Sequence, residues 1–188
     1  MLLTLTVAGR LLHSALWEIE PDMDNLRSVE KITEEHLERL SELARTDQAD
    51  RFERHPRWSA YAERVICVAL CQGAALHYLD GVNGVKDFDV YTFYAQDAVG
   101  PFPARWRRAA DFGPSVFGRY PPDPPQFVGR RVDLFGRSLE ASVDADPVDA
   151  VRAYLRSGRT STAHHLASKA VVGLYPSYLL GVVVWPAG

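Results

Sequence analysis

The sequence predicts a mixed fold of the α/β (α+β) class, in which a small mixed sheet is flanked by N-terminal and C-terminal helices. Short apolar or alternating runs, typical of strands, occur in the middle of the chain. Segments with helical periodicity precede and follow these runs. The chain has 188 residues, of which 47% are hydrophobic and 24% charged, so it can bury a core without disulfides. We expect one compact domain with three parts.

Residues 1–62 are expected to form an N-terminal helical extension. Apolar residues recur at helical spacing from Ser28 to about Ala44, with charged residues on the opposite face. A polar stretch follows, and a second helical segment is expected after Pro56. This part of the chain therefore precedes the predicted sheet.

The first 22 residues have two interpretations. They fit an edge strand, or an upstream extension of a protein whose translation starts at Met23 instead of Met1. The run lacks the basic start of a signal peptide and is too short to span a bilayer. Since Cys67 and Cys71 are too few for a disulfide framework, the expected location is the cytoplasm, without membrane contact.

Residues 63–140 are expected to form the core of the fold. An apolar run rich in β-branched residues predicts a buried strand, and a glycine after it predicts a break before a short helix. An alternating run rich in Val, Tyr, Thr and Phe predicts a second strand. The predicted elements are strands at 65–70, 87–95 and 127–135, a helix at 74–79, and a proline-rich loop at 96–126 with one helical turn near 104–110.

Residues 141–188 are expected to form helices that pack on this core. Asp146 is a typical N-cap, Pro147 suits the first helical position, and Gly158 is a typical residue after a helix end. The other predicted elements are a helix at 160–172 and a short strand at 180–185.

The formal net charge of −3 excludes a protein that binds nucleic acid through a basic overall charge. Arginines are nonetheless concentrated after the second predicted strand, where aromatic residues lie between them. Arginine binds phosphate through paired hydrogen bonds, so the cluster favours a phosphate-binding role, although a solvated loop explains single arginines. The cluster consists of Arg105, Arg107, Arg108, Arg119, Arg130, Arg131 and Arg137.

Three aspartates are the strongest candidates for chemistry. Asp87 and Asp89 are two residues apart on a predicted strand, so their side chains project from the same face. Two adjacent carboxylates repel, and a hard divalent cation such as Mg²⁺ compensates them. Asp133 lies between two apolar residues on the next predicted strand, and Arg131 shares its face. If these strands are neighbours, the three carboxylates meet and can hold two metal ions for phosphoryl or nucleotidyl transfer.

The order of these features resembles the polymerase-beta-like nucleotidyltransferase superfamily. That family has a hydrophobic residue, Gly, and Gly or Ser, followed by an acid–hydrophobic–acid–hydrophobic strand and a third acid on a later strand. Here Gln72-Gly73-Ala74 matches the first part partly, and Asp87-Phe88-Asp89-Val90 matches the second fully. The residues around Lys86 look most similar to small bacterial nucleotidyltransferase-like proteins, many of them from toxin–antitoxin systems. The resemblance spans about residues 63–140.

The resemblance implies roles for individual residues. Asp87, Asp89 and Asp133 would be catalytic and would ligate Mg²⁺ or Mn²⁺, and Asp133 would also help to deprotonate the attacking hydroxyl. Gly73 would let the backbone approach the triphosphate of an NTP, which is the implied substrate. An antitoxin is the implied protein partner.

The remaining nucleotide contacts are less complete. Ala74 stands where the family usually has Gly or Ser, so a hydroxyl for the γ-phosphate is missing, and Gln72 could substitute for it. Lys86 fits either a phosphate contact or a surface charge that balances Asp87, and Arg131 fits a phosphate contact.

Two functions follow. One is an enzyme that transfers a nucleoside monophosphate from an NTP to a hydroxyl of RNA, protein or a small molecule. The alternative is a catalytically inactive binding or regulatory module, whose interaction surface is the acidic face of the helix at 28–44. The presence of Asp133 favours the enzyme, because a decayed site is expected to lose its acids.

Overall fold

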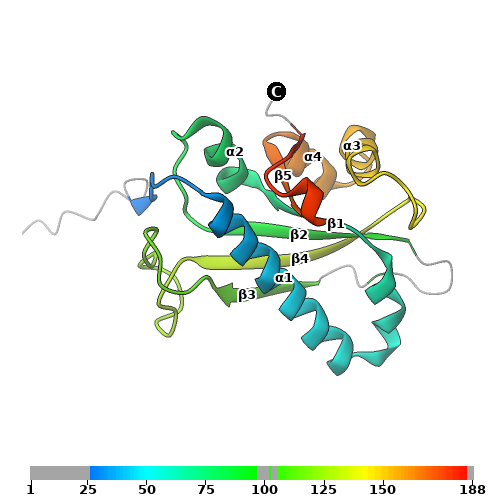
Figure 1. Ribbon diagram of the computed structural model, residues 1–188, viewed down its shortest axis with the longest axis horizontal. Coiled ribbons are helices and arrows are strands. Elements are labelled where there is room, and N and C mark those ends of the chain that lie inside the picture. Colours follow the sequence, from blue (N-terminus) through cyan, green and yellow to red (C-terminus); the bar gives the residue numbers. More distant parts are fainter. Residues whose placement is uncertain (1–25, 97–101, 103–105, 186–188) are drawn as a thin grey trace, which may run out of the picture.

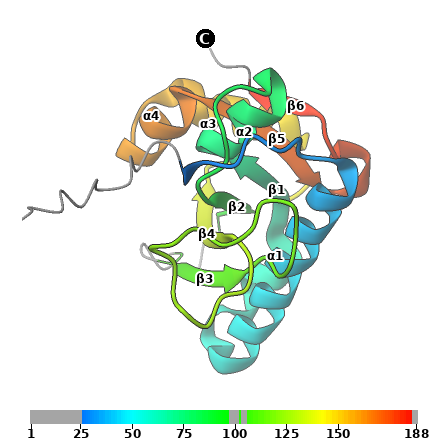
Figure 2. The same cartoon turned by 90° about the vertical axis from the view of Figure 1, so that its left-hand side faces the viewer.

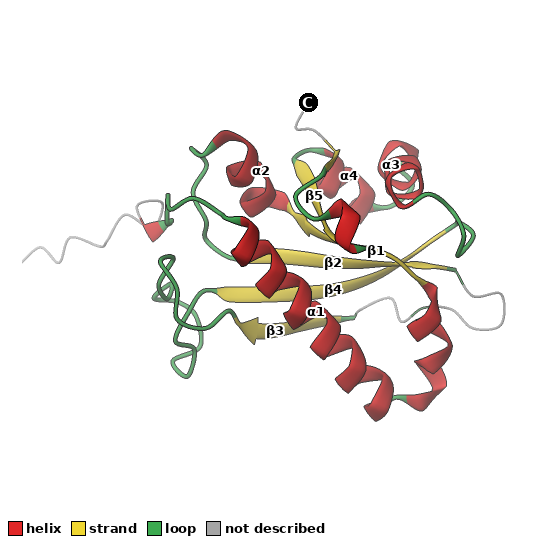
Figure 3. Ribbon diagram, viewed as in Figure 1, coloured by secondary structure: helices red, strands yellow, loops and turns green. Residues whose placement is uncertain are grey.

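The structure is a computed structural model that describes residues 26–96, 102 and 106–185 of the chain. Figure 3 shows which parts of it form helices, strands and loops. The elements are α1 (Glu34–Arg54), the 3-10 helix η2 (Pro56–Arg64), β1 (Val65–Cys71), α2 (Gln72–Asp80), β2 (Phe88–Ala95), β3 (Arg107–Asp111), β4 (Arg131–Leu139), α3 (Pro147–Ser157), α4 (Ser161–Ala167), β5 (Ala170–Tyr175), the 3-10 helix η3 (Ser177–Leu179) and β6 (Val183–Trp185).

One mixed sheet organises the described chain. Its six strands have the order β3-β4-β2-β1-β5-β6 (Figure 1). β2 and β4 are parallel, and the other neighbouring strands are antiparallel. The predicted fold class is therefore confirmed, since a mixed sheet lies between helices that precede and follow it. β2 has neighbours on both sides, which makes it one of the central strands.

The two faces of the sheet carry separate apolar clusters, because side chains alternate along each strand. Phe88 and Val90 of β2 belong to the cluster that α1 covers through Leu37 and Leu40. Tyr91 and Phe93, with residues of α3 and α4, belong to the cluster on the other face. Figure 2 shows α1 on one side of the sheet and α4 on the other. Asp89 shares the face of Tyr91, so it lies on the face opposite α1.

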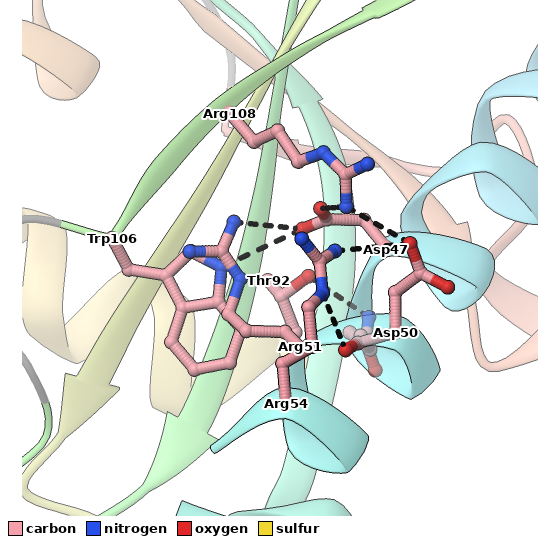
Figure 4. A network of polar contacts seen from close by, with 8 residues as sticks. Asp47, Asp50, Arg51, Arg54, Thr92, Trp106 and Arg108 are labelled. Carbon is pink, nitrogen blue, oxygen red and sulfur yellow. Dashed lines mark hydrogen bonds and ion pairs between the residues drawn. The ribbon is translucent and has the colours of Figure 1, made fainter.

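Asp47 fastens α1 to the sheet by polar contacts. It is 7% exposed and continues the buried stripe of Leu37, Leu40 and Ala44. Its carboxylate accepts hydrogen bonds from Arg51 at 3.0 Å and Arg108 at 3.3 Å (Figure 4). The Arg51 guanidinium also lies 3.9 Å from the centre of the Trp106 ring. Because Arg108 belongs to β3, this network joins the helix to the outer strand of the sheet.

Helix α1 ends ten residues later than predicted, at Arg54 and not near Ala44, and it begins at Glu34 and not at Ser28. The added part has no apolar periodicity, so its sequence indicated a polar linker. It is stabilised by ion pairs between residues four apart, Asp47 with Arg51 and Asp50 with Arg54.

Two strands were not predicted. The helical turn expected near 104–110 is wrong, because residues 107–111 form β3. This segment contains only Arg, Ala and Asp, which have low strand propensity. Its conformation is therefore determined by pairing with β4. The helix expected at 160–172 is also wrong beyond Ala167, since β5 follows and is buried between β1 and β6.

Smaller differences concern the ends of the elements. The third predicted strand begins at Arg131 and not at Phe127, because Asp111 accepts hydrogen bonds from the backbone of Val128 and Gly129 and holds that loop off the sheet. The last strand, expected from Leu180, covers only Val183–Trp185. The interpretations of residues 1–22, including the start at Met23, lie outside the described residues.

No helix of the described segments combines the length and the apolar character that crossing a membrane would need.

Replacing Asp47 by Ala should destabilise the protein by about 2–4 kcal/mol, because the largely buried Arg51 side chain loses its counter-ion. Denaturant unfolding followed by circular dichroism measures this change. Asp50→Ala is the matched control, since its exposed ion pairs should contribute less than about 1 kcal/mol. Equal effects of the two variants would contradict the role given to Asp47.

Candidate functional site

Strand pairing brings the predicted acids to one end of the sheet. Asp89 of β2 lies directly opposite Asp133 of the parallel strand β4. Asp87 stands one residue before β2 and shares the face of Asp89. On the other side, Asp89 is paired with Cys71, the last residue of β1. Helix α2 begins at the next residue, Gln72, so its N-terminus starts beside these acids.

The three acids differ in their hydrogen bonds. The Asp133 side chain is 4% exposed and accepts three hydrogen bonds from two arginines. Arg131 donates from Nε and Nη2 to Oδ1 at 2.9 and 2.7 Å, and Arg107 donates from Nη2 to Oδ2 at 2.9 Å. Within the part of the chain that the structure describes, the carboxylates of Asp87 and Asp89 have no hydrogen bond or ion pair.

This difference perturbs the ionisation of the two uncompensated acids. Burial, followed by the charges of Asp87 and Asp133, raises the pKa of Asp89 to about 7. Burial also raises the pKa of Asp87, although the charge of Lys86 opposes the shift. Near neutral pH the site therefore favours an additional positive charge, either a proton or a cation.

The start of α2 has neither a side-chain cap nor an acidic residue of its own. Its N-cap residue, Cys71, makes no side-chain capping bond, and the first turn contains no acidic residue. Gly73 has no atom within 4 Å of the position where a Cβ would lie. The N–H groups of the first turn are donors of the kind that bind phosphate at helix N-termini.

Gln72 is the unusual residue of this turn. Among the described residues it is the only one other than glycine with a positive φ, 64°, which costs roughly 1 kcal/mol. Its side chain is buried, and its Oε1 atom has no hydrogen-bond partner. A buried acceptor without a donor suits a site that a ligand or ion completes.

Ala74 cannot take the role of the missing hydroxyl residue through its side chain. It is 3% exposed and belongs to the apolar cluster under α1. Only its backbone can therefore contribute to the predicted nucleotide contact.

Cations surround the site unequally. Arg131 bonds Asp133, whereas Lys86 is exposed and its Nζ lies 5.6 Å from the centre of the Tyr120 ring. Two further cations act on Asp89, since the charges of Arg107 and Lys169 oppose the rise in its pKa. Neither was among the predicted site residues. Lys169 precedes Ala170, which pairs with Gln72, and the apolar run at 170–174 with its two adjacent valines could have indicated this strand.

The other arginines of the sequence cluster lie elsewhere. Arg130 is 4% exposed and donates to the backbone oxygens of Phe117, Lys86 and Leu26, so it holds loops together. Arg108 contacts α1 on the opposite face. Arg119 and Arg137 bond backbone oxygens near themselves in the chain, and Arg105 lies outside the described residues. Nearness in sequence therefore does not place the six described side chains of the cluster together.

The oxygen atoms of the three acids are the candidate ligands for a metal ion. In residues 26–96, 102 and 106–185, no three His, Cys, Asp or Glu side chains are grouped as a metal site. The Asp133 oxygens are bonded to arginines in this state. The free carboxylate oxygens of Asp87 and Asp89 are hard ligands that fit Mg²⁺ or Mn²⁺. The unpaired Oε1 atom of Gln72 is a further oxygen ligand, and Gln72 directly follows Cys71, the strand partner of Asp89.

A cavity of about 400 Å³ lies at the other end of β4, between this strand and α3. It is lined by small apolar residues such as Ala145 and Ala150 and by the ring of Tyr154. Six residues of strand separate Leu139, in its wall, from Asp133, which is about 20 Å at the usual strand rise. The three acids do not line it.

No family model matches the chain, and no similar protein was found among curated proteins or solved structures.

Replacing Asp89 by Asn should stabilise the metal-free protein at pH 8 by about 2 kcal/mol, roughly half of what the full pKa shift would give. A raised folded-state pKa means that ionising Asp89 lowers stability as the pH rises from about 4, its unfolded value, to about 7. The difference between the two proteins should therefore vanish near pH 4.

Denaturant unfolding in EDTA at several pH values between 4 and 8 measures this effect. Asp144→Asn, which changes an exposed carboxylate away from the sheet, is the control and should alter stability little at any pH. An Asp89→Asn protein that is less stable than the wild type at pH 8 would contradict the claim that the ionised Asp89 carboxylate destabilises the metal-free protein.

Proposed function

We propose that this protein is a metal-dependent nucleotidyltransferase that transfers a nucleoside monophosphate from an NTP to a hydroxyl of RNA, protein or a small molecule. The observation that carries the proposal is the pair Asp87 and Asp89, which are partly buried, have no hydrogen-bond donor in the described chain, and lie beside Asp133 and the N-terminus of α2. Acids that bind cations and helix N–H groups that bind phosphate are the two components that nucleotidyl transfer needs.

The acids would hold Mg²⁺ or Mn²⁺ through Asp87 and Asp89, with Asp133 as the third ligand. A bound divalent cation supplies charge neutralisation for the triphosphate and for the attacking oxygen. The raised pKa of Asp89 supports this role, because its carboxylate is poorly compensated without a cation. The protein contributes position, since β2 and β4 fix both backbones in one register.

The first turn of α2 would hold the triphosphate. The lack of a Cβ at Gly73 lets phosphate oxygens come close to the backbone N–H groups. The exposed amine of Lys86 and the partly exposed guanidinium of Arg131 are available to the same anion. The side-chain amide of Gln72 carries two N–H donors next to its orphaned oxygen, so it can also contact a phosphate.

The transfer itself would be a displacement at the α-phosphorus. The acceptor oxygen forms a bond to this phosphorus, the bond to the bridging oxygen breaks, and pyrophosphate leaves with that electron pair. The hydroxyl proton passes to a carboxylate of the site. We expect the reaction in the cytoplasm, a compartment that suits the two free, buried thiols of Cys67 and Cys71.

The alternative function is a binding module without catalysis. It is favoured by one observation, namely that both Asp133 oxygens are bonded to arginines. In that case the exposed acidic face of α1, with Glu34, Glu38 and Glu42, would be the surface for a protein such as an antitoxin. Nucleotide transfer distinguishes the two functions.

Incubation with each of the four α-³²P-labelled NTPs, Mg²⁺ or Mn²⁺, and bulk tRNA, protein or small hydroxylated molecules should label one class of acceptor. Asp89→Asn should reduce labelling about 100-fold or more, because a ligand for the transition-state charge is lost. Asp144→Asn is the matched control and should label normally. Nucleotide binding without transfer would favour the module. The absence of both binding and transfer would refute the proposal.

Substitution of Gly73 should weaken nucleotide binding without harming the fold. The position has open space and lies in the first turn of a helix, so Gly73→Ala should be as stable as the wild type or slightly more stable. Loss of one charge-assisted hydrogen bond corresponds to about 10- to 100-fold weaker binding, and Gly73→Val should weaken it further. Calorimetric titration with NTP measures this, and unchanged affinity in both variants would exclude backbone approach at Gly73.

A further inference from the structure

Two arginines occupy the carboxylate that the proposed site needs as its third acid. Arg131 lies on β4 two residues before Asp133, and Arg107 reaches the same carboxylate from β3. Together they give it three hydrogen bonds of 2.7 to 2.9 Å. The two side chains are 31% and 57% exposed, whereas the carboxylate itself is 4% exposed. The guanidinium groups therefore reach from the surface to a buried acid.

This arrangement is specific to one of the three acids. Asp89 lies directly opposite Asp133 on the neighbouring strand, yet within the described chain it has no ion pair or hydrogen bond. Both hydrogen-bonded cations of the site therefore contact Asp133, and neither contacts the Asp89 carboxylate. A buried carboxylate that lost both arginines without replacement would be strongly unfavourable.

We propose that Arg107 and Arg131 are exchangeable counter-ions, which hold Asp133 in the free protein and turn to the phosphates of the nucleotide when Asp133 takes a divalent cation. This inference rests on the proposed function and concerns its regulation. The exchange is chemically matched, because a guanidinium binds phosphate and carboxylate oxygens through the same pair of N–H groups. Each charge keeps a partner before and after the exchange.

The proposal makes metal and nucleotide binding interdependent. A cation alone must displace two arginines that then have no partner, so it binds weakly. A nucleotide alone gives the arginines a partner but leaves Asp133 without one. When both are bound, the nucleotide binds the arginines that the cation displaces, and the cation binds the Asp133 carboxylate that the arginines leave. A coupling of about 5- to 150-fold in affinity is typical of such linkage.

The test measures Mn²⁺ binding by the electron paramagnetic resonance signal of free Mn²⁺, with and without the four α,β-methylene nucleoside triphosphates. The wild type should bind Mn²⁺ at least about 5-fold more tightly when nucleotide is present. The double variant Arg107→Gln/Arg131→Gln should bind Mn²⁺ alone more tightly than the wild type, and nucleotide should add less than about 2-fold. These readouts are independent of catalysis.

Two further variants keep the result interpretable. Arg107→Gln alone leaves both Arg131 hydrogen bonds to Asp133 in place, so it should fold and show a smaller change in the same direction. Arg137→Gln removes a guanidinium from β4 that lies 5.9 Å from the centre of the Tyr91 ring and does not contact Asp133, so its Mn²⁺ binding should match the wild type.

The outcomes separate this inference from the function on which it rests. If the wild type binds Mn²⁺ and nucleotide without coupling, or if the arginine variants bind Mn²⁺ alone no better than the wild type, the exchange is refuted and the transferase proposal stands. If the wild type binds neither Mn²⁺ nor nucleotide, both fail. Coupling that disappears only in the Arg107 and Arg131 variants supports the exchange.

Discussion

The candidate site depends on one constraint, the parallel pairing of β2 with β4 in a register that sets Asp89 opposite Asp133. Opposite residues of a parallel pair project to the same face, so two carboxylates are brought together in surroundings poor in water. The protein compensates Asp133 with two hydrogen-bonded arginines, whereas Asp89 and Asp87 have no hydrogen-bonded counter-ion among the described residues. The cation binding proposed for the site rests on this asymmetry.

The outer strand β3 links this site to α1. Adjacent residues of a strand face opposite sides, so Arg107 reaches Asp133 while Arg108 reaches Asp47 on the other face. The same pairing of β3 with β4 therefore positions a counter-ion of the site and an anchor of the helix. A strand with little propensity of its own is held in place by charge on both faces.

Much of the fold follows from local patterns. The strands near 65–70 and 87–95 and the helix from Pro147 to Gly158 were predicted because periodicity, caps and turn glycines act over a few residues. The same patterns misjudged 104–110 and 160–172, where long-range pairing determines the conformation. Lys169 was missed as a neighbour of the acids for this reason, and Arg107 was predicted only as a member of the arginine cluster.

The sequence by itself determined the fold class, the common face of Asp87 and Asp89, and the glycine at the start of α2, since each depends on neighbouring residues. Only the tertiary structure decided which arginines meet the acids. Of the seven clustered in sequence, two bond Asp133, one fastens α1 and one holds loops together, because strand order and side-chain alternation set their partners. Charge compensation is a long-range property, and sequence proximity does not specify it.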